Sequence, residues 1–285
     1  MKLTFTKLNI LAIFSLVIAS FSSSSTANNS NDFTVATTQN KQTEATLNLV
    51  ANGEDFVRQG FVTKDGWEMN FDRLDVNLGE VTAYQVEAPF EPTESASVEP
   101  EYQNKVVLLE TPQIVDLAKG EADAEPITVT EKAVTPGAYN ALTWSIDTAE
   151  ADSPLAGNTM VMEGTASKEG RAIAFNISLN RPIQYLCGEY VGDDRKGIVK
   201  AGNAGELETT FHFDHVFGDG EASPDDAINV DALGFEPLAQ LASNDSLIVD
   251  DATLTQQLSP EDREKLTKAI IGLGHVGEGH CAVIE

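Results

Sequence analysis

The chain is poor in basic residues: 18 Lys and Arg stand against 45 Asp and Glu, which gives a formal net charge of −27 at pH 7. A surface of this kind repels nucleic acid and anionic lipid headgroups and attracts cations. We therefore exclude nucleic acid as a partner and expect a positively charged one. The alternative interpretation is that the acidity only keeps the protein soluble in a salty medium.

Long apolar runs are equally scarce, and the clearest of them lies near the N-terminus at residues 8–18. Lys2 and Lys7 precede this run and small residues around Ala27 follow it, an order that is typical of a secretory signal peptide. We expect residues 1–27 to be a signal peptide and the location to be periplasmic or secreted. Because a membrane helix needs about 20 apolar residues, we expect no membrane span in the mature chain.

Several catalytic signatures are missing from the sequence. It contains no Gly-x-Ser-x-Gly nucleophile elbow, no phosphate-binding loop and no dinucleotide fingerprint. We therefore do not expect an enzyme. A metal-dependent hydrolase is a minor alternative, since it would need an open coordination position and a general base such as Glu278.

Cysteine is also rare, and the two cysteines are Cys187 and Cys281. An even number of cysteines in an exported chain predicts a disulfide between them. The alternative is that Cys281, which directly follows His280, is a thiolate metal ligand.

What the chain does contain is a long series of short alternating segments. Residues 28–42 are rich in Asn, Thr and Ser and predict a flexible leader. From residue 43 the apolar residues recur every second position, and turns are expected at 64–66 and 167–170. The pattern predicts a mainly β domain over 43–217, an antiparallel β-sandwich that is immunoglobulin-like or related.

Helical signals appear only in the last quarter of the chain. Ser259 followed by Pro260 and an acidic residue is a helix start, and Gly272 is a helix end. We therefore expect residues 218–285 to form a helical C-terminal extension that packs on the sandwich.

The four histidines fall into two short clusters, which is the most specific feature of the sequence. Each cluster also contains an acid, and the candidate metal ligands are His212, Asp214, His215, His275, Glu278 and His280. Imidazole and carboxylate groups together suit zinc or copper, and the chain offers no Met-rich copper tract. We expect the two clusters to meet in space. The alternative is that each His is an ordinary structural side chain.

A set of short motifs lies at 65–67, 71–76, 107–109, 116–117, 135–139, 162–166 and 168–170. These motifs resemble those of a group of exported, uncharacterised β-sandwich proteins, and they are similar to the MbnP-like periplasmic proteins linked to copper and methanobactin handling. The resemblance covers most of the mature chain. It implies an immunoglobulin-like or related sandwich and metal handling, and it assigns no catalytic residue.

Together these features predict an exported protein that scavenges, buffers or delivers zinc or copper through its two His and acid clusters. The expected partners are the metal ion and a metal transporter or envelope protein. The alternative function is that of an envelope or secreted β-sandwich interaction module with structural histidines.

Overall fold

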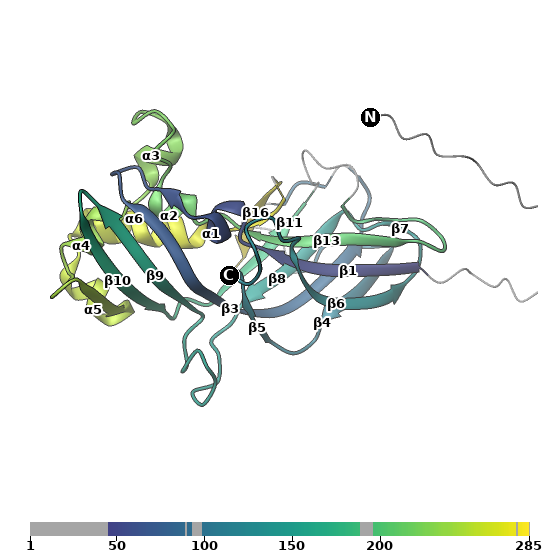
Figure 1. The fold of residues 1–285 in the computed structure, drawn as a ribbon. Helices are drawn as coiled ribbons and strands as arrows, with labels where there is room; N and C mark the ends of the chain where they lie inside the picture. Colours follow the sequence, from purple (N-terminus) through teal and green to yellow (C-terminus); the bar gives the residue numbers. More distant parts are fainter. Residues whose placement is uncertain (1–44, 89, 93–98, 189–195, 278, 285) are drawn as a thin grey trace, which may run out of the picture. The chain divides into compact units, whose positions relative to one another are not determined.

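The structure is a computed structural model of the 285-residue chain, and it describes residues 45–88, 90–92, 99–188, 196–277 and 279–284 (Figure 1). The expected signal peptide (1–27) and leader (28–42) lie outside the described residues, as does Glu278. For His280 the structure describes the backbone alone.

The described chain is mainly β, as the alternating pattern predicted. Its strands are β1 (Ala45–Asn52), β2 (Phe61–Val62), β3 (Glu68–Gln85), β4 (Asn104–Leu109), β5 (Gln113–Asp116), β6 (Ile127–Val134), β7 (Gly137–Ala138), β8 (Ala141–Ile146), β9 (Met160–Lys168), β10 (Arg171–Leu179), β11 (Ile183–Cys187), β12 (Ile198–Val199), β13 (Ala204–Phe211), β14 (Ser246–Asp250), β15 (Gly274–Val276) and β16 (Gly279–Ile284). The helices are α1 (Asp55–Gln59), α2 (Asp214–Phe217), α3 (Ala227–Asp231), α4 (Glu236–Ala239), α5 (Asp251–Gln257) and α6 (Pro260–Ile271).

Most of the strands join into one curled, mixed sheet with the order β14-β10-β9-β3-β8-β11-β16-β15-β13-β1-β6, and β2, β4 and β5 also pair with β3. Among the described pairs, β1–β13 and β10–β14 are parallel, so the sheet is mixed. The predicted antiparallel arrangement is therefore not confirmed. The two-layer, immunoglobulin-like arrangement stays a prediction.

The hairpin between β9 and β10 shows how local sequence sets the register. Lys168 pairs with Arg171, which leaves a two-residue loop at Glu169 and Gly170. Both loop residues have positive φ, 52° and 84°, and this is the geometry of a type I′ turn that matches the twist of the strands. The hairpin predicted around 167–170 is therefore confirmed.

An aromatic cluster fixes the helices to the sheet. The centroid of the Phe71 ring on β3 lies 5.8 Å from that of Phe175 on β10. It lies 6.3 Å from the rings of Phe213, which precedes α2, and Phe217, the last residue of α2. Phe213 and Phe217 are fully buried. Because these rings hold α2 against β3 and β10, the residues at the start of α2 have a fixed position over the sheet.

Helix α6 begins where the sequence predicted. Ser259 is its N-cap, with a side chain that accepts a hydrogen bond from the amide of Asp262, and Gly272 is its C-cap. Helices α2, α3 and α6 lie against one another (Figure 1). No helix within the described part of the chain is long and apolar enough to cross a membrane.

The C-terminal region differs from the helical extension that we expected over 218–285. It contains α3 to α6, but it also supplies β14, β15 and β16 to the sheet. The β15–β16 hairpin lies inside the strand order, between β13 and β11, rather than on its surface. The glycines of this tail weaken any local strand signal, so its strands depend on the partners that the rest of the fold provides.

Candidate metal centre

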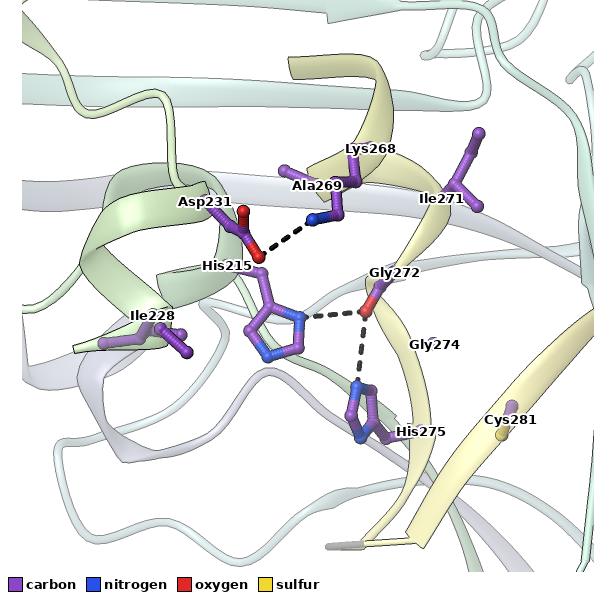
Figure 2. A pocket seen from close by; sticks show the side chains of 11 residues that line it. His215, Ile228, Asp231, Lys268, Ala269, Ile271, Gly272, Gly274, His275 and Cys281 are labelled. Carbon is purple, nitrogen blue, oxygen red and sulfur yellow. Dashed lines mark hydrogen bonds and ion pairs between the residues drawn. The ribbon is translucent and has the colours of Figure 1, made fainter. Parts of the chain in front are cut away.

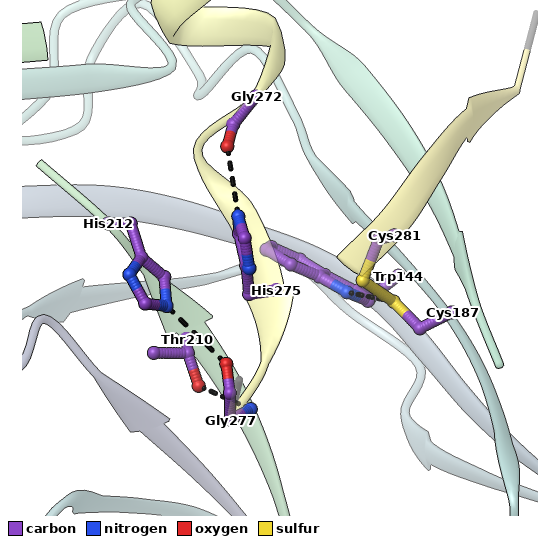
Figure 3. The surroundings of a disulfide bond; sticks show 8 residues. All are labelled: Trp144, Cys187, Thr210, His212, Gly272, His275, Gly277 and Cys281. Atoms are coloured by element: carbon purple, nitrogen blue, oxygen red, sulfur yellow. Dashed lines mark hydrogen bonds between the residues drawn. A yellow bond between two sulfur atoms is a disulfide. The ribbon is translucent and has the colours of Figure 1, made fainter. Parts of the chain in front are cut away.

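The two cysteines form the predicted disulfide. Cys187 on β11 and Cys281 on β16 are direct partners in the antiparallel ladder, with Cα atoms 4.2 Å apart. The indole Nε1 of Trp144 donates a hydrogen bond to Cys187 Sγ at 3.2 Å (Figure 3). The disulfide covalently attaches the C-terminal hairpin to the sheet, and the alternative of Cys281 as a thiolate ligand does not hold for this oxidised form.

The ladder between β13 and β15 brings the two histidine clusters together. Thr210 pairs with His275, and the amide of His212 donates a hydrogen bond to the carbonyl oxygen of Leu273 at 3.1 Å. His212, the first residue after β13, therefore lies directly beside His275 of β15. The two residues are 63 positions apart in sequence, so tertiary pairing alone places them side by side.

A helical turn brings His215 to the same side. Strand β13 ends at Phe211, and the amide of His215 donates to the carbonyl oxygen of His212. On a helical turn, side chains three residues apart lie on one face, whereas in a continued strand they would point in opposite directions. The end of the strand is thus what allows both histidines of the first cluster to face the second.

Three imidazole rings consequently form one group. Ring centroids are 4.1 Å apart for His212 and His275, 5.2 Å for His215 and His275, and 5.5 Å for His212 and His215. His212 and His275 are buried, with exposed fractions of 7% and 5%, while His215 is half-buried. The predicted meeting of the two clusters is present for these three rings.

Each ring has one nitrogen near a backbone carbonyl oxygen (Figures 2 and 3). The Gly272 oxygen lies 3.0 Å from His215 Nδ1 and 3.3 Å from His275 Nε2, and the Gly277 oxygen lies 3.4 Å from His212 Nε2. A carbonyl oxygen only accepts, so a neutral ring must place its hydrogen on the contacting nitrogen. The opposite nitrogen of each ring then carries the lone pair that a metal ion would use.

Two acids border His212. Asp214 Oδ1 is 3.9 Å from His212 Nδ1 and also accepts a hydrogen bond from the amide of His215. Ligand atoms of His212, Asp214 and His215 lie within 4.8 Å of one another, which is close enough to hold one ion after small side-chain adjustments.

The second acid, Glu54, was not among the residues that the sequence singled out. Its Oε2 lies 3.4 Å from His212 Nδ1. Glu54 has φ 64° and ψ 171°, a backbone conformation that is essentially restricted to glycine. No local motif marks this acid in an acidic chain, because only the tertiary structure brings it to His212.

A buried polar network supports the loop at Gly277. Lys196 Nζ lies 2.6 Å from Glu208 Oε2, and the hydroxyl of Thr210 donates to Glu208 Oε1 at 2.7 Å. The same hydroxyl accepts a hydrogen bond from the amide of Gly277 at 2.9 Å (Figure 3). These contacts fix the position of the Gly277 carbonyl oxygen beside Nε2 of His212.

A pocket of about 410 Å³ opens beside the group of rings, between α3, α6 and β15. His215 and His275 form part of its wall, and the ion pair between Asp231 and Lys268 forms another part (Figure 2). The hydrogen bond from Lys268 lowers the pKa of Asp231 below its ordinary value. Of the three rings, those of His215 and His275 therefore reach the pocket wall.

Four of the six candidate ligands lie together in the structure: His212, Asp214, His215 and His275. The backbone of His280 pairs with His275 across the β15–β16 hairpin. Glu278 lies outside the described residues. Comparison of the chain with known protein families, with curated proteins and with solved structures finds no match.

Proposed function

We propose that this protein is an exported transition-metal-binding protein that scavenges, buffers or delivers zinc or copper. The proposed ligands are His212, His215 and His275 together with Asp214. The curled β sheet, which we propose to be a sandwich, is the rigid frame that carries these ligands. The resemblance to MbnP-like proteins is consistent with this function.

The observation that carries the proposal is the spacing of the rings. Imidazole nitrogens at about 2.0–2.1 Å from one tetrahedral ion place the ring centroids about 5 Å apart. Two of the three centroid distances, 5.2 and 5.5 Å, are close to that value. The third, 4.1 Å, requires the rings of His212 and His275 to separate slightly on binding.

The surroundings of the rings also suit a cation. Backbone carbonyls that fix one nitrogen of each ring are the usual outer partners of metal-binding histidines. Glu54 and Asp214 add negative charge at His212, and the net charge of −27 attracts cations over the whole surface. Three imidazole donors favour zinc or copper over calcium or magnesium, which prefer oxygen ligands.

A structural role for the histidines is the rival interpretation, because the carbonyl contacts would also satisfy three buried rings with no ion. In that case the protein would be an envelope or secreted interaction module. Metal titration separates the two interpretations, since a structural cluster has no requirement for an ion.

The test is calorimetric titration of the purified, tag-free protein with zinc and with copper. We expect one high-affinity ion per chain. In His215→Ala we expect the affinity for the ion to fall by at least about 100-fold. Loss of a group that only hydrogen-bonds a metal ligand typically costs about 10–100-fold in affinity, and loss of a ligand itself should cost more. Asp225→Asn removes an exposed acid that is not among the proposed ligands and is the matched control. Equal affinity of His215→Ala and the parent protein would refute the proposed site.

A further inference from the structure

The pocket beside His215 and His275 is larger than an ion and its water require. Its volume is about 410 Å³, whereas one water molecule takes up about 30 Å³ in the liquid. Pockets of a few hundred Å³ are typical of sites for small organic molecules. Because the two rings form part of the wall, a molecule in this pocket would contact two of the proposed metal ligands.

The rest of the wall combines apolar surface with one ion pair. Ile228 of α3 and Ala269 and Ile271 of α6 supply the apolar part (Figure 2). Lys268 Nζ lies 2.8 Å from Asp231 Oδ2, and both side chains are more than half exposed. Since Lys268 has three donor hydrogens, it can hold Asp231 and a second acceptor at the same time.

The charge around this pocket differs from that of the chain as a whole. An adjoining groove of about 620 Å³ shares Lys268 and Ile271 with the pocket and adds Arg181 and Arg263. Glu264 also lines the groove, and Arg181 pairs with Asp251 at 2.8 Å. Three cationic side chains on one side of α6 nevertheless form a local concentration in a chain with only 18 Lys and Arg.

From these features we infer that the pocket binds a small organic carboxylate. Its apolar body would lie against Ile228 and Ile271, and its carboxylate would lie toward Lys268, His215 and His275. The inference rests on the proposed function, because the carboxylate would lie beside His215 and His275, and the positive charge of an ion bound by these rings would attract it. The protein would then bind metal and organic anion together as a ternary complex.

The experiment uses benzoate as the probe, titrated by calorimetry into the full protein with and without one equivalent of zinc. We expect benzoate to bind the zinc-loaded protein at least about ten-fold more tightly than the metal-free protein. Ala227→Trp places a large side chain on an exposed position of the pocket wall and should abolish benzoate binding. Val230→Trp on the same helix, exposed and outside the pocket, is the matched control and should bind normally.

Charge variants test the direction of the effect. Lys268→Met should weaken benzoate binding about ten-fold, and Asp231→Asn should strengthen it, because Lys268 then has no competing carboxylate. Lys132→Met removes a lysine of β6 that pairs with Glu110 and is not part of the pocket wall, and it should leave binding unchanged. A hydrophobic pocket without anion recognition would show none of these opposite changes.

The outcomes separate the inference from the proposed function. If zinc binds but benzoate does not bind, or binds Ala227→Trp as well as the parent protein, the inference is overturned and metal binding stands. If zinc does not bind, the proposed function and the ternary complex are both overturned. Benzoate binding that Ala227→Trp abolishes in metal-free protein would then still identify an anion pocket.

Discussion

His215 Nδ1 lies 3.0 Å from the carbonyl oxygen of Gly272, the residue that caps the C-terminus of α6. The last carbonyls of a helix have no partner within the helix and carry partial negative charge. At this helix end, His215 and His275 both approach the same oxygen. The C-terminal end of α6 therefore contacts two of the three rings, so a shift of this helix would move the carbonyl oxygen that holds them.

The first prediction concerns the shared use of the rings. His212→Ala and His275→Ala should each weaken zinc binding by at least about 100-fold, and the double variant should be little weaker than either one, because both changes break one site. Calorimetric titration of the three variants measures this. Independent, additive losses would mean that the two rings do not bind the same ion.

The same site should lose affinity in acid. A protonated imidazole cannot bind a cation, and ordinary His side chains protonate near pH 6.5. Zinc affinity should therefore fall as the pH drops from 7.5 to 5.5. The Asp225→Asn control should follow the same curve as the parent protein.

The second prediction concerns Glu54, whose backbone conformation suits glycine. Glu54→Gly should raise the free energy of unfolding by about 1 kcal/mol, because it relieves a strained φ and ψ pair. It should also lower zinc affinity by about ten-fold, because it removes the carboxylate beside His212. Denaturant unfolding in zinc-free buffer and zinc titration measure the two effects.

Glu54→Ala is the control that separates strain from charge. It removes the carboxylate but keeps a Cβ on the strained backbone, so affinity should fall without the gain in stability. A gain in stability for Glu54→Ala equal to that for Glu54→Gly would contradict the strain explanation.

The third prediction concerns the disulfide. Replacing both cysteines, Cys187→Ala with Cys281→Ala, should lower the free energy of unfolding by about 4 kcal/mol, because the loop that the bond closes is long. The two cysteines are 94 residues apart in sequence. Thiol labelling of the denatured, unreduced parent protein should find no free thiol, and two free thiols would rule the bond out.

The loss of the disulfide should also affect the metal site. Strand β16 carries Cys281 and pairs with β15, which carries His275. Zinc affinity of the cysteine-free variant should therefore fall, and added zinc should restore part of its stability, since an ion that binds only the folded state stabilises it.

The fourth prediction concerns Glu236. The Trp67 indole donates a hydrogen bond to its carboxylate at 3.0 Å, which lowers the pKa of Glu236 below its ordinary value, and Lys168 adds to the effect. A carboxylate with a lowered folded-state pKa contributes stability that is present above its unfolded pKa and is lost as the pH falls through the folded pKa.

Glu236→Gln should accordingly destabilise the protein at pH 7, by less than about 1 kcal/mol for so exposed a pair, and have little effect near pH 3. Denaturant unfolding at the two pH values measures the difference. Glu101→Gln changes an exposed carboxylate elsewhere and should show no such pH dependence. A larger effect of Glu236→Gln at pH 3 than at pH 7 would contradict the assignment.

Much of the fold could be predicted from local sequence because the physical signals are local. The period-two alternation gave a mainly β chain, the turn at Glu169 and Gly170 gave a hairpin, and the cap at Ser259 gave the start of α6. The pairing of Cys187 with Cys281 was predicted from the even number of cysteines in a chain that we expect to be exported. Each of these depends on a few neighbouring residues or on composition.

The sequence by itself also determined which residues could bind a metal, since it has four histidines in two clusters beside acids. Only the tertiary structure decided that three of the rings meet, because the β13–β15 pairing that joins them is a contact between distant segments. It also decided that Glu54 borders His212 and that the C-terminal hairpin lies within the sheet. Hydrogen-bonded pairing between distant strands has no local code, so no pattern in the chain could have specified it.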